Sequence, residues 1–289
     1  MIGWLIYQQK DAEQNESYIN WFLHEAQQQQ VDLKLVYREE LSIGVIDQSP
    51  VVYLNHQKQT LPHFVVNRSI ETIVQHFFTQ CNIPVFNTAD TAKIVNNKAR
   101  THLELSKLHI PMLPTLFIHG RALPEEAPFH YPVIVKAVAG RSGTEVFFLE
   151  DKQAWQTFKE QCTNQEYIVQ PTTVQLGKDV RVFIIGTEIV AAVLRHNETD
   201  FRANFKLGGK AIPYQLSVEE EKMIHKIINH FEFGLVGIDF LIDDHGNILF
   251  NEIEDVVGSR ILSETSDINL LEKYVTYIKE TVKKQENEM

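Results

Sequence analysis

Residues 235–255 place three acidic side chains in a segment where two apolar runs flank a polar turn. This pattern predicts two short antiparallel strands joined by a turn at residues 244–247. The turn would place Asp239 opposite Glu252. Glu254 would share the face of Glu252, because side chains two residues apart on a strand point the same way. We therefore expect three carboxylates to converge on one patch of an otherwise apolar sheet.

Three converging carboxylates need a positive partner, because a carboxylate is almost never buried unpaired. Hard oxygen ligands on a rigid sheet suit Mg²⁺ or Mn²⁺, which also hold the phosphates of a nucleotide. We therefore predict that Asp239, Glu252 and Glu254 bind a divalent metal ion. The alternative is an edge hairpin whose acids face water, and the hairpin alone favours neither interpretation.

The composition of the 289 residues is that of an ordinary soluble protein, and the length suits two or three subdomains. A net charge of -11 argues against a surface that coats nucleic acid. No apolar run approaches the ~18 residues of a membrane helix, and the N-terminal stretch is typical of a first strand rather than a signal peptide. Cys81 and Cys162 are expected to be small buried residues. Together these features predict a cytoplasmic protein, and they leave its oligomeric state open, a homo-oligomer included.

The chain divides into three predicted units. Residues 1–90 alternate between strand-like and helix-like segments, which predicts a mostly parallel sheet covered by helices. Residues 91–172 predict a small layer of strands with a helix that Asp151 can cap. Residues 173–289 are richer in antiparallel strands, with one hairpin turning at Gly186 and the acidic hairpin after it. The expected fold class is α/β for the first unit and α+β for the other two.

Two further segments carry residues that suit phosphate binding. Lys136 lies inside the apolar strand predicted at 131–137, and the glycines that follow it let the backbone approach a ligand closely. Residues 198–211 interleave basic and aromatic side chains, and contain Arg202 and Asn204, which can bind phosphate or carboxylate oxygens. The alternatives are an edge lysine whose stem reaches water and a surface loop with scattered charge.

Asp179 and Arg181 share one face of a predicted strand, where a cross-strand ion pair is as well supported as a ligand contact. Other nucleotide-binding folds have no support, since neither G-x-x-x-x-G-K-[ST] nor G-x-G-x-x-G occurs in the sequence. The chain also lacks G-x-S-x-G, H-E-x-x-H and C-x-x-C, so serine-nucleophile and zinc chemistry are not indicated.

The order of these features resembles the ATP-grasp superfamily, and within it the RimK-like carboxylate–amine ligases, which add glutamate to protein or peptide ends. The shared order is a strand lysine with a glycine turn, the strand 166–171, G-x-D-x-R at 177–181, D-F-R-x-N at 200–204, and an aspartate strand followed by E-x-E. Residues 86–115 are similar to the family's entry to its central domain. The resemblance implies an ATP-grasp fold with an N-terminal parallel α/β domain, a small central lid domain and a C-terminal antiparallel-sheet domain.

The resemblance also implies a role for each candidate residue. Lys98 and Lys136 would bind the phosphates of ATP, and Arg202 and Asn204 would contact phosphates and the reacting acyl group, with Arg202 and Lys136 carrying most of the catalytic stabilisation. The remaining positions would bind adenine, the ribose and two Mg²⁺ or Mn²⁺ ions; they are Gln170, Pro171 and Thr172 at the adenine hinge, Asp179 near the ribose, and Asp239, Glu252 and Glu254 at the metal ions.

The chain departs from the family pattern in four places. Glu145 stands where the glycine loop usually ends in glycine, which should make the lid stiffer and more acidic. Pro171-Thr172 replaces the usual Glu-Tyr of the hinge, and proline removes a backbone donor. Glu254 replaces an asparagine metal ligand, which should tighten divalent binding. Residues 255–260 replace a small-residue segment that lies near the acceptor substrate.

The function implied by the resemblance is an ATP- and Mg²⁺-dependent ligase. It would join a small-molecule or peptide carboxylate to an amine, such as an amino acid, through an acyl phosphate. One alternative is an ATP-grasp kinase that stops at the phosphorylated substrate, and another is a nucleotide-binding protein without turnover. The sequence names neither substrate, nor the number of residues added.

Overall fold

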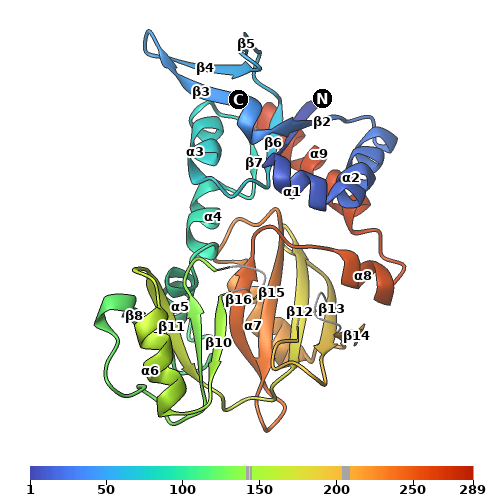
Figure 1. Cartoon of the computed structure of the whole chain (residues 1–289). Helices are drawn as coiled ribbons and strands as arrows, with labels where there is room; N and C mark the ends of the chain where they lie inside the picture. The colour runs from blue at the N-terminus through green and yellow to red at the C-terminus, as the bar shows by residue number, and fades with distance from the viewer. Residues whose placement is uncertain (141–142, 144, 204–208, 289) are drawn as a thin grey trace.

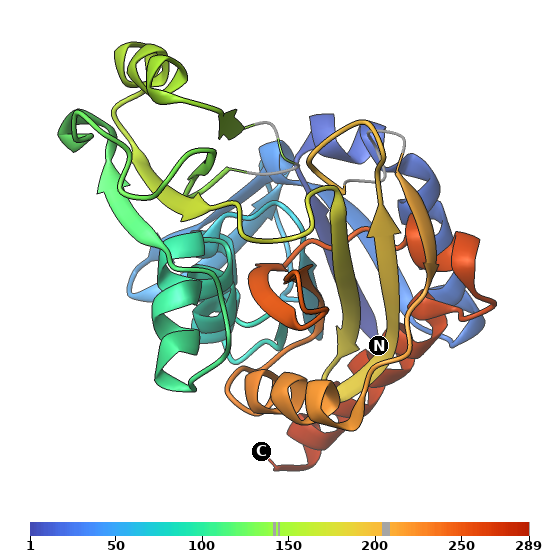
Figure 2. The same ribbon diagram turned by 90° about the horizontal axis from the view of Figure 1, so that it is seen from below.

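The structure is a computed structural model that describes residues 1–140, 143, 145–203 and 209–288. Its described strands form three larger sheets and one small meander, and the three larger sheets follow one another along the chain (Figure 1). Viewed from below, the central sheet stands to one side of the C-terminal sheet, with the N-terminal sheet behind them (Figure 2). The predicted mixture of one parallel sheet and two antiparallel sheets is confirmed, whereas the domain boundaries at 90/91 and 172/173 stay predictions.

The N-terminal sheet is parallel, with the strand order β2-β1-β6-β7. Helices bury both of its faces, as all-parallel sheets require: Phe22 of α2 packs on the side of Leu5, and Phe78 of α3 packs on the side of Trp4. The elements of this region are β1 (Ile2–Tyr7), α1 (Gln9–Gln14), α2 (Glu16–Gln28), β2 (Asp32–Tyr37), η1 (Arg38–Glu40), β6 (Phe64–Asn67), α3 (Thr72–Gln80) and β7 (Val85–Phe86).

A small antiparallel meander inserted between β2 and β6 has no counterpart in the sequence prediction. Leu41 and Val52 of this meander are buried in the same cluster as Trp4 and Phe78, so it covers part of the N-terminal sheet. Two helices then lead to the central sheet, and Thr88 and Asn97 cap them with their side chains. These elements are β3 (Leu41–Ile46), β4 (Ser49–Leu54), β5 (Gln57–Lys58), α4 (Ala89–Val95) and α5 (Lys98–Lys107).

The central sheet is antiparallel, with the order β10-β9-β11-β8. Asp151 caps its helix as predicted, because its side chain accepts a hydrogen bond of 2.8 Å from the Ala154 amide. Trp155 and Phe158 of that helix pack on the sheet. Cys162, at the end of the helix, and Cys81 are free thiols that are partly exposed rather than buried. The elements are β8 (Leu116–His119), η2 (Gly120–Ala122), β9 (Val133–Ala137), β10 (Val146–Leu149), α6 (Lys152–Gln161) and β11 (Glu166–Pro171).

The C-terminal sheet is antiparallel, with the order β14-β13-β12-β15-β16, and the predicted turn at Gly186 adopts a φ of 56°. One face packs on α7, while the other shares a core with the N-terminal sheet and α9, in which Phe22 lies 5.6 Å from Tyr274 between ring centroids. The elements are β12 (Lys178–Ile185), β13 (Glu188–His196), β14 (Lys210–Pro213), α7 (Val218–Ile228), β15 (Leu235–Ile242), β16 (Ile248–Glu254), α8 (Arg260–Thr265) and α9 (Leu270–Glu288). None of the helices in the described part of the chain is both long and apolar enough to cross a bilayer.

Candidate active site

The acidic hairpin has the predicted pairing, with Asp239 of β15 opposite Glu252 of β16, but it reaches this register in an unexpected way. The connecting turn is one residue longer than predicted, since the Asp243 amide bonds to the Asn247 carbonyl. That turn alone would set Asp239 opposite Asn251. A bulge beside Asp239 leaves Asn251 as the extra residue and restores Glu252 to the opposite position.

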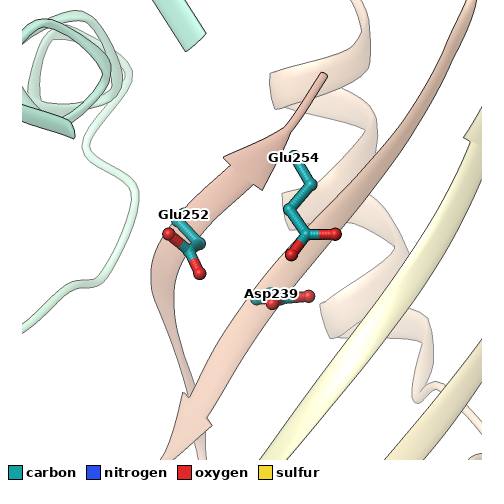
Figure 3. Close-up of side chains that lie close together, drawn as sticks. All are labelled: Asp239, Glu252 and Glu254. Carbon is teal, nitrogen blue, oxygen red and sulfur yellow. The ribbon is translucent and has the colours of Figure 1, made fainter. Parts of the chain in front are cut away.

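The three carboxylates of the hairpin converge as predicted (Figure 3). Oxygen atoms of Asp239, Glu252 and Glu254 lie within 4.8 Å of one another. Asp239 is 2% exposed, while the side chains of Glu252 and Glu254 are 29% and 33% exposed. The acids therefore neither all face water nor all lie in the core, and all three line one pocket.

The chain itself supplies positive partners to these acids. Arg181 binds both oxygens of Asp239 at 2.7 Å and Glu254 at 2.8 Å. Arg195, which lies opposite Asp179 on β13, binds both oxygens of Asp179 and also reaches Asp239 at 2.7 Å. The cross-strand ion pairs weighed for Asp179 and Arg181 are thus present, each with a partner on a neighbouring strand. Buried ion pairs contribute little net stability, so this network is better explained by what it positions.

Two lysines from different elements meet the acidic hairpin. Lys98, the first residue of α5, lies 3.1 Å from Glu252 and donates a 2.6 Å hydrogen bond to the Gly140 carbonyl. Lys136, on β9 of the central sheet, donates a 2.7 Å hydrogen bond to Oδ1 of Asn251. The bulge therefore matters for the site, because Asn251, the extra residue that it creates in β16, is the hydrogen-bond partner of Lys136.

Burial and the neighbouring charges shift the protonation equilibria of these groups. Burial lowers the pKa of Lys136 to about 8, against a smaller opposing effect of Glu252. Burial raises the pKa of Asp239, but Arg181 and Arg195 outweigh it and hold the value at about 2. Burial raises the pKa of Glu254 more than Arg181 lowers it. The arginines therefore lower the pKa of Asp239, whereas burial raises that of Glu254 although it pairs with Arg181.

Arg202 lies beside the same pocket. It donates to both carboxylate oxygens of Asp200 and also to the Gly143 carbonyl at 2.8 Å, which links the loop after β13 to the glycine turn of the central sheet. Its guanidinium lies 5.3 Å from the ring centroid of Phe201. Asn204, which the resemblance places beside Arg202, lies outside the described residues.

The predicted adenine hinge lies at the end of β11. Gln170 donates to the Thr115 hydroxyl at 2.9 Å, while its buried Oε1 has no hydrogen-bond partner among the described residues. Thr172 donates to the Pro132 carbonyl. Gln170 and Pro171 line the pocket, whereas Thr172 is not among its lining residues.

A single pocket brings together most of the residues named from the sequence: Lys98, Lys136, Gln170, Pro171, Asp179, Arg202, Asp239, Glu252 and Glu254. Sequence reasoning missed Arg195 and Asn251, which hold Asp179 and Lys136. It also missed His102, which packs against Phe250 and bonds to the Asn251 carbonyl at 3.0 Å. Burial lowers the pKa of His102 to about 4, so the ring is neutral and donates from Nε2 to that carbonyl. The only signal for Arg195 was its position across the Gly186 hairpin from Asp179.

The residues present fit a nucleotide and a divalent ion. The ion pairs use Oε2 of Glu252 and Oε1 of Glu254, which leaves hard oxygen ligands of the kind that Mg²⁺ prefers. Lys98 and Lys136 can neutralise phosphates, and the unpartnered Oε1 of Gln170 can accept a hydrogen bond from an exocyclic amine such as that of adenine. Which of these side chains contact a ligand stays a prediction.

Comparison with known proteins shows the family of this chain. The model of the RimK-like ATP-grasp domain matches residues 95–278, more than half of the chain. The alpha-aminoadipate–LysW ligase LysX of Saccharolobus solfataricus is 27% identical over 225 residues, 74% of this chain and 81% of that protein. A probable alpha-L-glutamate ligase of Legionella pneumophila is 31% identical over 160 residues, 53% of this chain and 51% of that protein. The chain matches 65% of the length of an uncharacterized Mycoplasma pneumoniae protein, and 43% of a Mycoplasma genitalium one.

Solved structures share the fold. The ATP-grasp ligase PsnB, complexed with a minimal precursor, matches with a TM-score of 0.73 over 98% of both chains at 15% identity. A RimK domain protein of Sphaerobacter thermophilus matches with a TM-score of 0.72, over 96% of this chain and 99% of that chain, at 14% identity. The predicted ATP-grasp fold is confirmed, and the chain belongs to the RimK-like ATP-grasp family.

Proposed function

We propose that the protein is an ATP- and Mg²⁺-dependent carboxylate–amine ligase. The observation that carries the proposal is the convergence of two lysines, from α5 and β9, on three carboxylates of one hairpin within a single pocket. ATP with its divalent ion would activate a substrate carboxylate as an acyl phosphate, which an amine then converts to an amide.

The protein's part in this reaction is positioning and charge compensation. Lys98 and Lys136 would bind phosphate oxygens, and Arg202 would stabilise charge that develops on the transferred group. Glu252 and Glu254 would hold the divalent ion, while Arg181 and Arg195 keep Asp239 ionised and oriented beside them. Mn²⁺ would serve in the same place as Mg²⁺, because both prefer carboxylate oxygen ligands.

The names of two relatives support an amino acid as the amine substrate, since one ligates alpha-aminoadipate and the other is a probable glutamate ligase. We propose that this chain likewise joins an amino acid to a small-molecule or peptide carboxylate. Residues 255–260 differ from the family pattern in the segment near the acceptor substrate, so we do not extend the glutamate specificity of the relatives to this chain.

The test is ADP release from ATP·Mg²⁺ across a matrix of amino acids and peptide carboxylates, with mass spectrometry of the products. A ligase releases ADP and phosphate only when both substrates are present, and the product mass equals their sum less one water. A stable phosphorylated product that accumulates over many turnovers in step with ADP, and that an amine does not convert to an amide, would establish the kinase alternative. ATP binding without turnover anywhere in the matrix would support the non-catalytic alternative.

A further inference from the structure

Arg68 is a buried cation that the proposed reaction does not use. It follows β6 directly and is 7% exposed. Its Nη1 donates to the Tyr18 hydroxyl at 3.3 Å, its Nη2 donates to the Val257 carbonyl at 3.1 Å, and its guanidinium lies 4.6 Å from the Tyr18 ring centroid. Among the described residues, Nε has no hydrogen-bond acceptor.

Two acids of this region, Glu71 and Asp255, are hydrogen-bonded to other groups. Glu71, in the same loop, accepts a hydrogen bond of 2.8 Å from Arg38. Asp255 acts on Arg68 electrostatically, but its two oxygens accept hydrogen bonds from the side chains of Asn87 and Asn96. A buried cation whose counter-charge is held elsewhere is costly, and an anion at its free donor would remove much of that cost.

Tyr7 supplies a second unsatisfied donor at the same place. It is the last residue of β1 and is 1% exposed. Its hydroxyl makes no hydrogen bond of ordinary geometry with the described residues; Arg68 acts on it as a weak hydrogen-bond donor, which leaves the hydroxyl proton without an acceptor among them. Its ring centroid lies 5.5 Å from the guanidinium carbon of Arg68. Burial raises the pKa of Tyr7 to about 12, so the hydroxyl keeps its proton and can donate. A buried polar group without a partner needs an explanation, and a missing ligand is one.

The position of these two donors in the fold is typical of a ligand site. β1 and β6 are neighbours in the sheet. The chain passes from β1 to β2 on one side of this pair, and from β6 to β7 on the other side, so the strand order changes direction between β1 and β6. In open parallel sheets, ligands bind outside the carboxyl ends of the strands at such a switch point. Ile70, two residues after Arg68, adopts a φ of 70°, a strained conformation for a β-branched residue that is common at binding sites.

The switch point also lies next to the proposed active site. Val257, which Arg68 holds, packs against Gly237, where a Cβ atom would lie 2.6 Å from the Val257 side chain. Gly237 pairs with Glu254 across the acidic hairpin. The connection from β16 to α8 runs beneath the N-terminal sheet, between it and the C-terminal sheet (Figure 1). Val257 therefore contacts both Arg68 and β15, the strand that bears Asp239.

We propose that Arg68 and Tyr7 form a carboxylate-binding site, which holds the carboxylate of the amino-acid substrate that does not react. Arginine and a phenol hydroxyl together match the two oxygens of a carboxylate. The identity of the ligand as a substrate rests on the proposed ligase function, whereas the existence of the site does not. The Val257 contact would couple occupancy of the site to the segment 255–260 beside the acidic hairpin.

Tyr7→Phe is the decisive variant, because the hydroxyl proton that it removes has no acceptor among the described residues. A purely structural role predicts unchanged or higher stability and no effect on ligands. Thermal unfolding of the full chain without ATP would be followed against L-glutamate, L-aspartate and L-2-aminoadipate, with their dimethyl esters as probes that lack carboxylates. We expect at least one free acid, and no ester, to raise the melting temperature of the wild type. The dissociation constant should be about tenfold higher in Tyr7→Phe.

Tyr214→Phe is the matched control, because that hydroxyl donates to Glu220 far from the site and its loss should leave amino-acid binding unchanged. Arg68→Gln should lose binding altogether, but it also removes the Val257 contact, so Tyr7→Phe carries the test. The proposal is overturned if no acid stabilises the wild type, or if Tyr7→Phe and wild type respond alike. If amino-acid binding depends on Tyr7 but the protein releases no ADP, the carboxylate site stands and the proposed ligase function is refuted. If Tyr7→Phe releases ADP in a substrate-dependent way with the KM values of the wild type, the ligase function stands and the carboxylate site is refuted.

Discussion

Lys98 and Glu252 form an ion pair, with 3.1 Å between Nζ and Oε2, which ties the start of α5 to the strand that bears the acidic residues. The Lys98 ammonium also donates to the Gly140 carbonyl. A phosphate that binds Lys98 would compete with both contacts and leave Glu252 without its cation. A divalent ion arriving with the phosphate would replace that cation, so the pair predicts that nucleotide and metal bind together.

Removing the Lys98 ammonium should weaken nucleotide binding. For Lys98→Ala we expect a dissociation constant for ATP·Mg²⁺ that is higher by about 10- to 100-fold, the effect of losing one charge-assisted hydrogen bond. Titration calorimetry measures it directly. Lys107→Ala is the control, since Lys107 lies at the exposed end of the same helix and pairs with Glu104. Equal affinities for the two variants would exclude Lys98 from the phosphate site.

Replacing Glu254 by asparagine should change the metal requirement more than the reaction. Asparagine keeps an oxygen ligand but removes the charge that also pairs with Arg181 at 2.8 Å. We expect Glu254→Asn to need roughly tenfold more Mg²⁺ for half-maximal ATP binding, with turnover retained at saturating Mg²⁺. Glu264→Gln, on the exposed side of α8, should behave as wild type. A Mg²⁺ requirement unchanged by Glu254→Asn would remove Glu254 from the metal site.

The lowered pKa of Lys136 predicts a pH dependence of nucleotide binding. Because burial lowers this pKa to about 8, the ammonium is charged below pH 8 and loses its proton above it. ATP affinity should therefore fall above pH 8, by up to about tenfold per pH unit, since binding must then take up a proton. Between pH 8 and the unfolded value near 10.4, the unfolded chain holds the extra proton, so this lysine makes the free energy of unfolding rise with pH.

Lys136→Arg provides the comparison, because a guanidinium stays charged throughout this range. The dissociation constant of Lys136→Arg for ATP should stay constant between pH 7 and 9, even if it differs from that of the wild type. Parallel pH profiles for wild type and Lys136→Arg would show that another group causes the dependence.

Truncating Arg202 should slow turnover with a smaller effect on ATP affinity. If the guanidinium stabilises charge on the transferred group, Arg202→Ala should lower kcat by ~10²–10³. Arg121→Ala, an exposed arginine of the central unit, serves as the control. Near-normal turnover in Arg202→Ala would leave Arg202 with only its contacts to Asp200 and Gly143.

The acidic hairpin could be predicted because its information is local. Strand alternation predicted the faces on which Asp239 and Glu252 lie. The predicted pairing of these two residues is correct although the turn is one residue longer than expected, because the bulge at Asn251 restores the register. Bulges depend on packing across the sheet rather than on local sequence, so the partner of Lys136 was not foreseeable.

The cations of the site were harder to predict than its acids. Arg195 reaches Asp239 only because β12 pairs with β13 on one side and with β15 on the other, an arrangement fixed by the whole sheet. The prediction that the carboxylates need a positive partner was right, and the partners within the chain are arginines and lysine. The meander at β3–β5 was missed because its exposed strands, with Val45 71% exposed, lack the apolar alternation of a buried sheet.

If the acidic hairpin and the two lysines hold ATP through a divalent ion, ATP binding must depend on both the ion and the carboxylates. Titration of wild type and Glu252→Gln with ATP, in the presence of Mg²⁺ and in EDTA, measures this dependence. We expect the wild type to bind ATP at least about tenfold more tightly with Mg²⁺ than without it, and Glu252→Gln to lose most of this difference. Equal affinity of the wild type in Mg²⁺ and EDTA, or an undiminished Mg²⁺ effect in Glu252→Gln, would contradict it.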